Sequence, residues 1–226
     1  MNTKTFCKWV PFVAVLMLIS TNGWSKSTHR GRAQEEAHVT ISVYNDAGVP
    51  LDVLQRAEDE ASRVFRQAGI QVQWLNCLVP AVSEEASSAC REAVFPEHLH
   101  LRIVRKSLGL KGETMGISFQ TDDGRGCYAD LFYEPMEDLR RSDGTDVASL
   151  LGYVAAHEIG HLLLGTNSHA VAGIMHAHWT AGELASTKTG EMVFLAKESR
   201  QMKERLITAA QISREASPAV VVQGGK

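Results

Sequence analysis

The stretch HEIGHLLLGTNSH, residues 157–169, places two histidines four positions apart with a glutamate directly after the first. An α-helix turns about 100° and rises about 1.5 Å per residue, so His157 and His161 would share one face, one turn apart. Both imidazoles could then reach one ion. Glu158 would lie about 60° beyond His161 around the same axis, beside that ion. This spacing predicts a zinc site in which two ligands and a general base come from one helix.

A hydrolytic zinc site usually has three protein ligands and keeps a fourth position for water. His169 lies eight positions after His161, about 12 Å further along the axis if the helix continued, so the chain has to turn back. Gly165 follows the apolar run 162–164 and can take the left-handed conformation that ends helices. His169 is therefore the expected third ligand.

Three residues further along remain open as alternative ligands. Glu183 lies twenty-two positions after His161, near the spacing at which thermolysin-like enzymes have a glutamate ligand. It could instead close a capping box with Thr180 at a helix start. His176 and His178 have suitable side chains, but they could equally support the ligands, polarise a substrate carbonyl or lie on the surface.

The order of these residues resembles the metzincin clan of zinc peptidases, whose motif is H-E-x-x-H-x-x-G-x-x-H followed by a methionine-containing turn. This chain reads H-E-x-x-H-x-x-x-G-x-x-x-H, one residue longer on each side of the glycine. Asn167 occupies the position of the clan's third histidine. Gly173-Ile174-Met175 resembles the Met-turn, so the chain resembles a divergent branch of the clan over residues 157–175.

This resemblance implies a zinc metalloendopeptidase, a hydrolase with a zincin-like fold that acts on a peptide or protein substrate. His157, His161 and His169 would bind one Zn²⁺ ion, Glu158 would activate the zinc-bound water, and Met175 would support the site. In the clan, the edge strand of the sheet lies antiparallel to the bound peptide, and the segment just before the active-site helix is suited to that role. The alternative is a secreted, zinc-stabilised binding module without catalysis, but a structural site does not need Glu158.

The N-terminus predicts export from the cytoplasm. Lys4 and Lys8 precede an apolar run over residues 9–19, and small or polar residues follow to Ser25, which is typical of a signal peptide. An uncleaved membrane anchor is the alternative. We expect a secreted or periplasmic protein with a signal peptide (1–25), a flexible segment (26–36), one metzincin-like catalytic domain (37–212) and a flexible tail (213–226).

Composition and cysteine usage agree with one exported globular domain. The chain has 226 residues, 44% of them hydrophobic, and a formal charge of −3. Its basic residues are dispersed among acidic ones, so we expect no nucleic-acid partner and, after signal cleavage, no membrane partner. The sequence does not determine the oligomeric state. Cys77 and Cys90 bracket a polar stretch without a clear strand or helix pattern and are expected to form a disulfide, which leaves Cys127 as a small buried residue.

Apolar periodicity predicts an α/β fold of the α+β kind, a mixed twisted sheet with a crossover helix, an active-site helix and a C-terminal helix. The opening strand, crossover helix and strand form a parallel β-α-β unit. His98 and His100 share one face of a strand, where we expect them to be exposed, a ligand pair being the alternative. The expected strands cover 38–44, 70–75, 98–104, 115–120 and 127–133, and the expected helices cover 51–68, 146–164 (N-cap Thr145 or Asp146) and 190–211.

Overall fold

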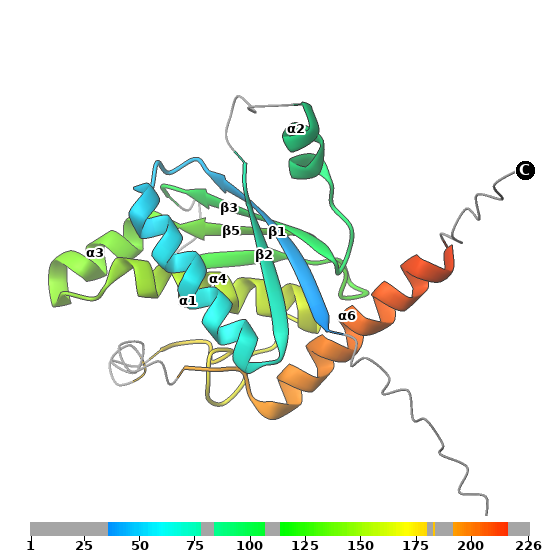
Figure 1. Cartoon of the computed structure of the whole chain (residues 1–226). Helices are drawn as coiled ribbons and strands as arrows, with labels where there is room; N and C mark the ends of the chain where they lie inside the picture. Colours follow the sequence, from blue (N-terminus) through cyan, green and yellow to red (C-terminus); the bar gives the residue numbers. More distant parts are fainter. Residues whose placement is uncertain (1–35, 78–83, 107–113, 180–182, 184–191, 217–226) are drawn as a thin grey trace, which may run out of the picture. The chain divides into compact units, whose positions relative to one another are not determined.

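The structure, a computed structural model, describes residues 36–77, 84–106, 114–179, 183 and 192–216 (Figure 1). The predicted signal peptide, the segment after it up to residue 35 and the tail from residue 217 lie outside the described residues. The elements, in chain order, are β1 (Ala37–Asn45), α1 (Leu51–Gln67), β2 (Ile70–Asn76), α2 (Glu84–Arg91), β3 (His98–Val104), β4 (Gly116–Phe119), β5 (Tyr128–Phe132), α3 (Tyr133–Asp143), α4 (Val147–Leu164) and α6 (Ala196–Ala216).

The five strands form one mixed sheet in the order β2-β1-β3-β5-β4. β1 pairs in parallel with β2 and β3, and β3 pairs in parallel with β5. β4 pairs antiparallel with β5 and occupies one edge of the sheet. The predicted mixed sheet and its β1-α1-β2 crossover are therefore confirmed.

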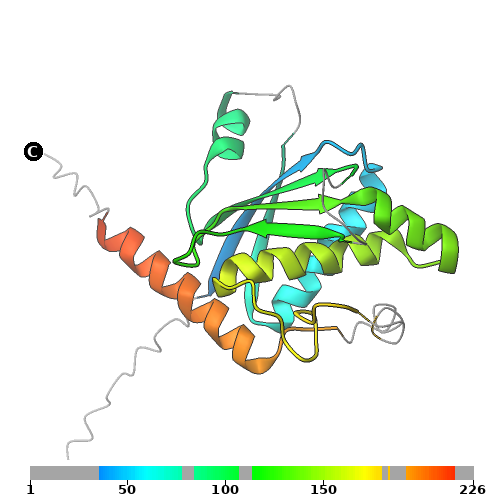
Figure 2. The ribbon, with the colours of Figure 1, turned by 180° about the vertical axis from the view of Figure 1, so that it is seen from behind.

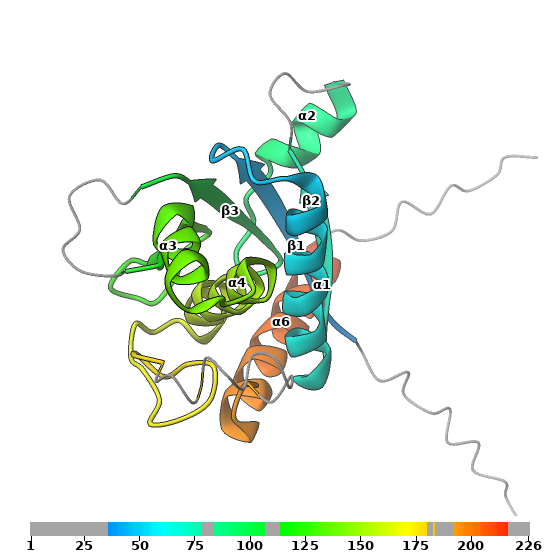
Figure 3. The ribbon, with the colours of Figure 1, turned by 90° about the vertical axis from the view of Figure 1, so that its left-hand side faces the viewer.

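Helices α1 and α4 cover one face of this sheet and pack against each other (Figure 3). Their contact is close because α4 carries Gly152 there, where an added Cβ would lie 2.5 Å from the carbonyl oxygen of Ala57 in α1. Leu101, Leu131 and Leu151 meet in the layer between sheet and helices. α4 is long and apolar enough to cross a membrane by length and composition alone, but 94% of it is buried inside the fold, as in the core helix of a globular protein. The motif of residues 157–161 thus lies on the most buried helix that the structure describes.

Helix α6 crosses the end of this layer and contacts both α4 and β1 (Figure 2). Its side chains reach the last turn of α4, where Gln201 donates to the carbonyl oxygen of Leu164 (3.0 Å) and Arg205 to that of Leu163 (3.4 Å). The last carbonyls of a helix have no partner within it, so these bonds satisfy groups that would otherwise lack one. α6 therefore fixes the end of α4 that carries His161.

Several predicted elements differ from the structure. The helices Glu84–Arg91 and Tyr133–Asp143 were not predicted. The first of them covers the described part of the polar stretch that we expected to lack a clear helix pattern. The C-terminal helix spans Ala196–Ala216, so it begins later than predicted, and the first residues of the expected flexible tail, 213–216, are helical. The strand that precedes the active-site helix, β5, lies inside the sheet, and β4 is the edge strand instead.

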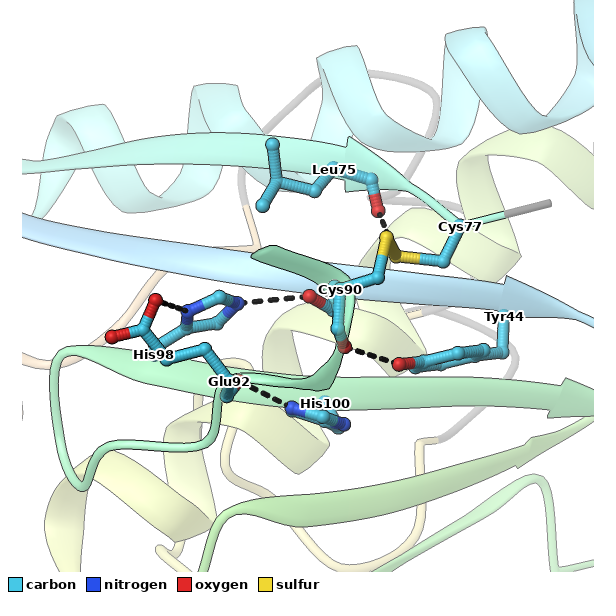
Figure 4. Close-up of a disulfide and its surroundings, with 8 residues drawn as sticks. Tyr44, Leu75, Cys77, Cys90, Glu92, His98 and His100 are labelled. Atoms are coloured by element: carbon cyan, nitrogen blue, oxygen red, sulfur yellow. Dashed lines mark hydrogen bonds and ion pairs between the residues drawn. A yellow bond between two sulfur atoms is a disulfide. The ribbon is translucent and has the colours of Figure 1, made fainter. Parts of the chain in front are cut away.

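The prediction that His98 and His100 are exposed is wrong, because both are buried beneath the chain around residues 90–98 (Figure 4). The ring of His98 lies 2.8 Å from the hydroxyl of Ser42, which is fully buried, and its other nitrogen lies 3.9 Å from the Glu92 carboxylate. His100 bonds the carbonyl oxygen of Glu92 (2.6 Å). These contacts attach the segment after α2 to the face of the sheet opposite α1 and α4.

The predicted disulfide between Cys77 and Cys90 is confirmed, and it joins the end of β2 to α2 (Figure 4). Tyr44 adds to this junction by donating a hydrogen bond to the carbonyl oxygen of Cys90. Cys127 is a free thiol and is half-buried rather than buried. Burial raises the pKa of the Cys127 thiol, so it is protonated at neutral pH.

Candidate metal centre

The active-site helix begins and ends where the sequence predicts. Asp146 is the N-cap, and its carboxylate accepts hydrogen bonds from the backbone N–H of Ser149 (3.3 Å) and from the Ser149 hydroxyl (2.8 Å). Gly165 ends the helix in the left-handed conformation, with φ of 68°. Its N–H bonds the carbonyl oxygen of His161 (2.9 Å), as in helix C-terminal motifs. The chain turns at this glycine.

The turn brings His169 back to the two histidines of α4. The ring centroid of His169 lies 5.4 Å from that of His157 and 4.9 Å from that of His161. One ring nitrogen from each of the three lies within 4.8 Å of the others. His157 and His161 are buried, whereas His169 is exposed. This is the spacing of three imidazoles around one cation.

The hydrogen bonds of two of these rings determine where their protons lie. His157 Nδ1 is 2.7 Å from the carbonyl oxygen of Ile174, and His161 Nδ1 is 2.8 Å from that of Thr166. A carbonyl oxygen only accepts, so each Nδ1 carries a hydrogen, and each Nε2 of a neutral ring has a free lone pair. These two Nε2 atoms face each other at 3.0 Å.

Two lone pairs at this distance repel each other unless a cation lies between or beside them. Burial lowers the pKa of His157 to about 4 and also lowers the pKa of His161, so both rings are neutral at pH 7. A proton is therefore a poor partner for this pair, and a divalent metal ion is a good one. Neutral imidazole is a preferred ligand for zinc, so the donor set fits that ion.

Met175 lies under this group, with 1% of its surface exposed. Its approach to α4 depends on Gly160, where an added Cβ would lie 2.8 Å from both Met175 Sδ and Phe194 Cε1. The turn before it is tied to the ligands, because the carbonyl oxygen of Ile174 accepts from His157 and also from Trp179 Nε1 (3.3 Å). The methionine turn thus holds the orientation of the His157 ring.

Glu158 is also buried, with 6% of its surface exposed. In the absence of a metal ion, burial raises the pKa of its carboxyl group to about 8, and a hydrogen bond from Ser118 opposes this rise. Ser118 lies on β4, so the glutamate is enclosed between α4 and the edge strand of the sheet. Without a cation this carboxyl group is therefore mostly protonated at pH 7. A cation bound beside it would lower its pKa and favour the ionised form that a general base needs.

The three alternative ligands lie elsewhere than in the histidine group. Glu183 bonds His176 Nδ1 at 2.8 Å, and its suggested capping partner Thr180 lies outside the described residues. His176 and His178 are near enough to His169 to lower its pKa, after the larger effect of burial. In the described part of the chain, the group of three side chains that could hold a metal ion consists of His157, His161 and His169.

The residues around Glu158 on β4 were not predicted from the sequence. Gly116 and Ser118 contact the Glu158 side chain, and Gln120 Nε2 donates to the carbonyl oxygen of His161 (2.6 Å). Small and polar residues recur here at every second position, which is the period of one strand face. That alternation was the available signal, but it does not say what the face contacts.

Comparison with known proteins gives a distant structural similarity. No protein-family model matches the chain, and no curated protein matches it. The chain is similar to a zinc-dependent peptidase from Methanocorpusculum labreanum, at 15% identity and a TM-score of 0.48, over 72% of this chain and 99% of that one. It is also similar to archaemetzincin from Methanopyrus kandleri, at 15% identity and a TM-score of 0.46, over 76% of this chain and 97% of that one. The assignment of the site rests on its own residues.

Proposed function

We propose that the protein is a zinc-dependent metallopeptidase, with His157, His161 and His169 as the zinc ligands and Glu158 as the general base. The observation that carries this proposal is the pair of unprotonated Nε2 atoms facing each other at 3.0 Å, each fixed by a backbone carbonyl on the far side of its ring. Such an arrangement is unfavourable in a protein that binds no cation. Glu158, next to His157 in the chain, adds a buried base at the same place.

A zinc ion held there would act as a Lewis acid and would lower the pKa of a coordinated water to about 7. Glu158 would accept the proton of the attacking water, because a cation at the site favours its ionised form while burial keeps its proton affinity above that of an exposed glutamate. It then gives this proton to the amine that leaves when the peptide bond breaks. One carboxyl group therefore serves as base and then as acid.

The edge strand β4 is the part of the structure best suited to hold a peptide substrate. One side of β4 pairs with β5, and the strand is last in the sheet, so its other side offers backbone groups to an added strand. The same strand contacts Glu158 through Gly116 and Ser118. A peptide added to β4 would thus lie next to the base. We assign the substrate as an extended peptide or a protein segment.

The test of this function is the variant Glu158→Gln, measured by zinc content and by digestion of a peptide library. We expect the wild-type protein to bind zinc and cleave peptides, and the variant to keep its zinc and to lose about 10²-fold to 10⁴-fold in kcat. A matched control is Glu204→Gln, which changes an exposed glutamate on α6. If Glu158→Gln cleaves as well as the wild type, Glu158 is not the base. If the wild type binds zinc and cleaves no peptide, the binding module is the better assignment.

We further propose that the protein acts outside the cytoplasm, as a secreted or periplasmic enzyme. The apolar run over residues 9–19 supports this, and so does the disulfide between Cys77 and Cys90, because disulfides persist in oxidising compartments. N-terminal sequencing of the protein recovered from each cell fraction tests it. A mature N-terminus near residue 26 in the exported fraction is expected, and an intact Met1 in the cytoplasm would exclude export.

A further inference from the structure

The inner face of β4 contacts the active-site helix at three alternate positions. A Cβ added at Gly116 would lie 2.7 Å from both Cγ and Oε1 of Glu158. Ser118, two positions further on the same face, is near enough to the Glu158 carboxyl group to lower its pKa as a hydrogen-bond donor. Gln120 bonds the carbonyl oxygen of His161 at 2.6 Å. Alternate residues of a strand point to the same side. One face of β4, continued by the residue after the strand, therefore lies against α4.

The pairing of β4 with β5 agrees with this orientation. Gly116 is opposite Leu131 and Ser118 is opposite Ala129, and both partners are buried on the side of the sheet that faces the helices. Phe119 is opposite Tyr128, and these two side chains are about half exposed, at 48% and 52%. The register of β4 thus directs Ser118 towards Glu158.

We propose that Ser118 is a positioning residue for the base Glu158, which rests on the function proposed above. The serine hydroxyl donates to the Glu158 carboxylate, since an ionised carboxylate only accepts hydrogen bonds. This fixes one carboxylate oxygen and leaves the other to accept the proton of the attacking water. A buried carboxylate without this bond can turn away from the water, and each small misplacement lowers the rate of the chemical step.

Gly116 has a complementary part in the same arrangement. It provides the space that Glu158 occupies, because any larger residue would bring a Cβ within 2.7 Å of the glutamate side chain. Real Cβ atoms do not approach other atoms so closely. Substitution at Gly116 therefore has to move the carboxylate, whereas substitution at Ser118 only removes its hydrogen bond.

The kinetic experiment compares Ser118→Ala and Ser118→Thr with the wild-type, zinc-loaded protein on one cleaved peptide. We expect Ser118→Ala to lower kcat at least about tenfold with little change in KM and no loss of zinc, a typical effect of removing a group that orients an active-site side chain. Ser118→Thr keeps the hydroxyl and should recover most of the rate. Gly116→Ala should lower kcat further while zinc is retained.

The matched control is Ser62→Ala on α1, which removes a half-buried hydroxyl that accepts a hydrogen bond from Trp74 Nε1 (2.8 Å) far from the site in sequence. Its kcat should equal that of the wild type. An unchanged kcat for Ser118→Ala, a loss confined to KM, or a Thr variant as slow as the Ala variant would each overturn the proposal.

A second measurement does not depend on activity. Urea midpoints of the metal-free wild type, Ser118→Ala, Glu158→Ala and the double variant form a double-mutant cycle, because alanine at 158, unlike glutamine, leaves no acceptor for the serine hydroxyl. We expect the two single shifts not to add, because the hydrogen bond is lost in each. Additive shifts would show that the two side chains do not interact and would overturn the proposal. If the wild type cleaves no peptide, the proposed function fails, and the cycle still tests the contact between Ser118 and Glu158.

Discussion

At the scale of single residues, the orientation of the candidate metal ligands depends on the hydrogen bonds that two of the histidine rings make with backbone carbonyls. The carbonyl oxygens of Ile174 and Thr166 fix the tautomers of His157 and His161 and leave two lone pairs directed at one point. Both carbonyls belong to the chain after Gly165. The segment that supplies the third histidine therefore also orients the first two.

The structure permits a direct test of the third ligand. We predict that His169→Ala leaves the purified protein with substoichiometric zinc, because only two imidazoles remain at the site. Glu183→Ala should keep its zinc, since Glu183 bonds His176. Metal analysis after dialysis against a weak chelator measures both. The opposite pattern, with zinc kept in the first variant and lost in the second, would assign the ligand to Glu183.

Gly160 offers a second test at this scale. We predict that Gly160→Ala destabilises the fold by about 1–3 kcal/mol, the usual cost of inserting a methyl group into a packed core. The added Cβ would meet Met175 Sδ and Phe194, which are both buried. Urea denaturation gives the value.

A Gly160→Ala variant as stable as the wild type would show that Met175 does not pack against α4 as described. Zinc affinity tests whether Met175 also supports the candidate metal ligands. If Met175 supports the ligands, the variant also binds zinc more weakly, because the turn that holds the His157 ring is displaced with it.

At the scale of elements, the active-site helix is held at both ends and on most of its surface. Asp146 caps its start, and Gln120, Gln201 and Arg205 bond three carbonyl oxygens of its last turn. Gln120 comes from the end of β4 and the other two from α6. Helix ends are the first parts to fray, so these bonds keep His161 at a fixed height along the axis.

We predict that Asp146→Ala lowers the free energy of unfolding by about 1 kcal/mol, the usual value of an N-cap side chain. The exposed ion pair of Asp146 with Arg56, at 3.4 Å, should add little. Urea denaturation again gives the value. Asp138→Ala, which breaks an exposed ion pair with Arg141 on α3, is the matched control and should be nearly neutral. Equal losses in the two variants would contradict the capping role.

Elements with strong periodicity could be predicted from the sequence, and weakly patterned ones could not. The helical repeat from Leu51 and the cap pair Asp146 and Gly165 give α1 and α4 to within a residue. α3 has two buried side chains, Tyr133 and Met136, near its start, so it shows no repeated apolar stripe. Its residues looked like the end of a strand and a loop.

The histidines of β3 show a limit of another kind. Alternation indicates that His98 and His100 point away from Leu99, but it does not indicate what lies on that side. The chain around residues 90–98 covers them, and it is held there by the disulfide and by contacts with Glu92. The three candidate metal ligands could be predicted from their spacing. The contact between Glu158 and β4 could not, because it depends on the order of the strands in the sheet, which the spacing of the motif does not determine.

At the scale of the whole molecule, one carboxyl group makes folding sensitive to pH. Glu58 on α1 is half-buried beside a cavity of about 10 Å³ that is lined by Leu54, Trp74 and Leu101 among others. Among the described residues, its Oε1 has no hydrogen-bond partner. Burial raises the pKa of Glu58 to about 7.

The folded state therefore binds a proton that the unfolded state releases between about pH 4.5 and pH 7. Stability from this group is fully present below about pH 4.5 and is lost as the pH rises through 7. We predict that Glu58→Gln removes this loss, so that the variant is more stable than the wild type at pH 8 and similar to it at pH 4. Urea titrations at both pH values measure the difference. A difference of the same size at both would show that Glu58 does not titrate as described.

Because side chains alternate along β4, substitutions on one face of the strand affect Glu158 and substitutions on the other face do not. Gly116 and Ser118 face the base, while Ile117 and Phe119 face the opposite side, across from Asp130 and Tyr128. If a peptide adds to β4 as proposed, mutations at the odd-numbered positions would alter which sequences are recognised without disturbing Glu158. Selection can therefore change the preference of such a protein one substitution at a time, while the even-numbered positions stay constant.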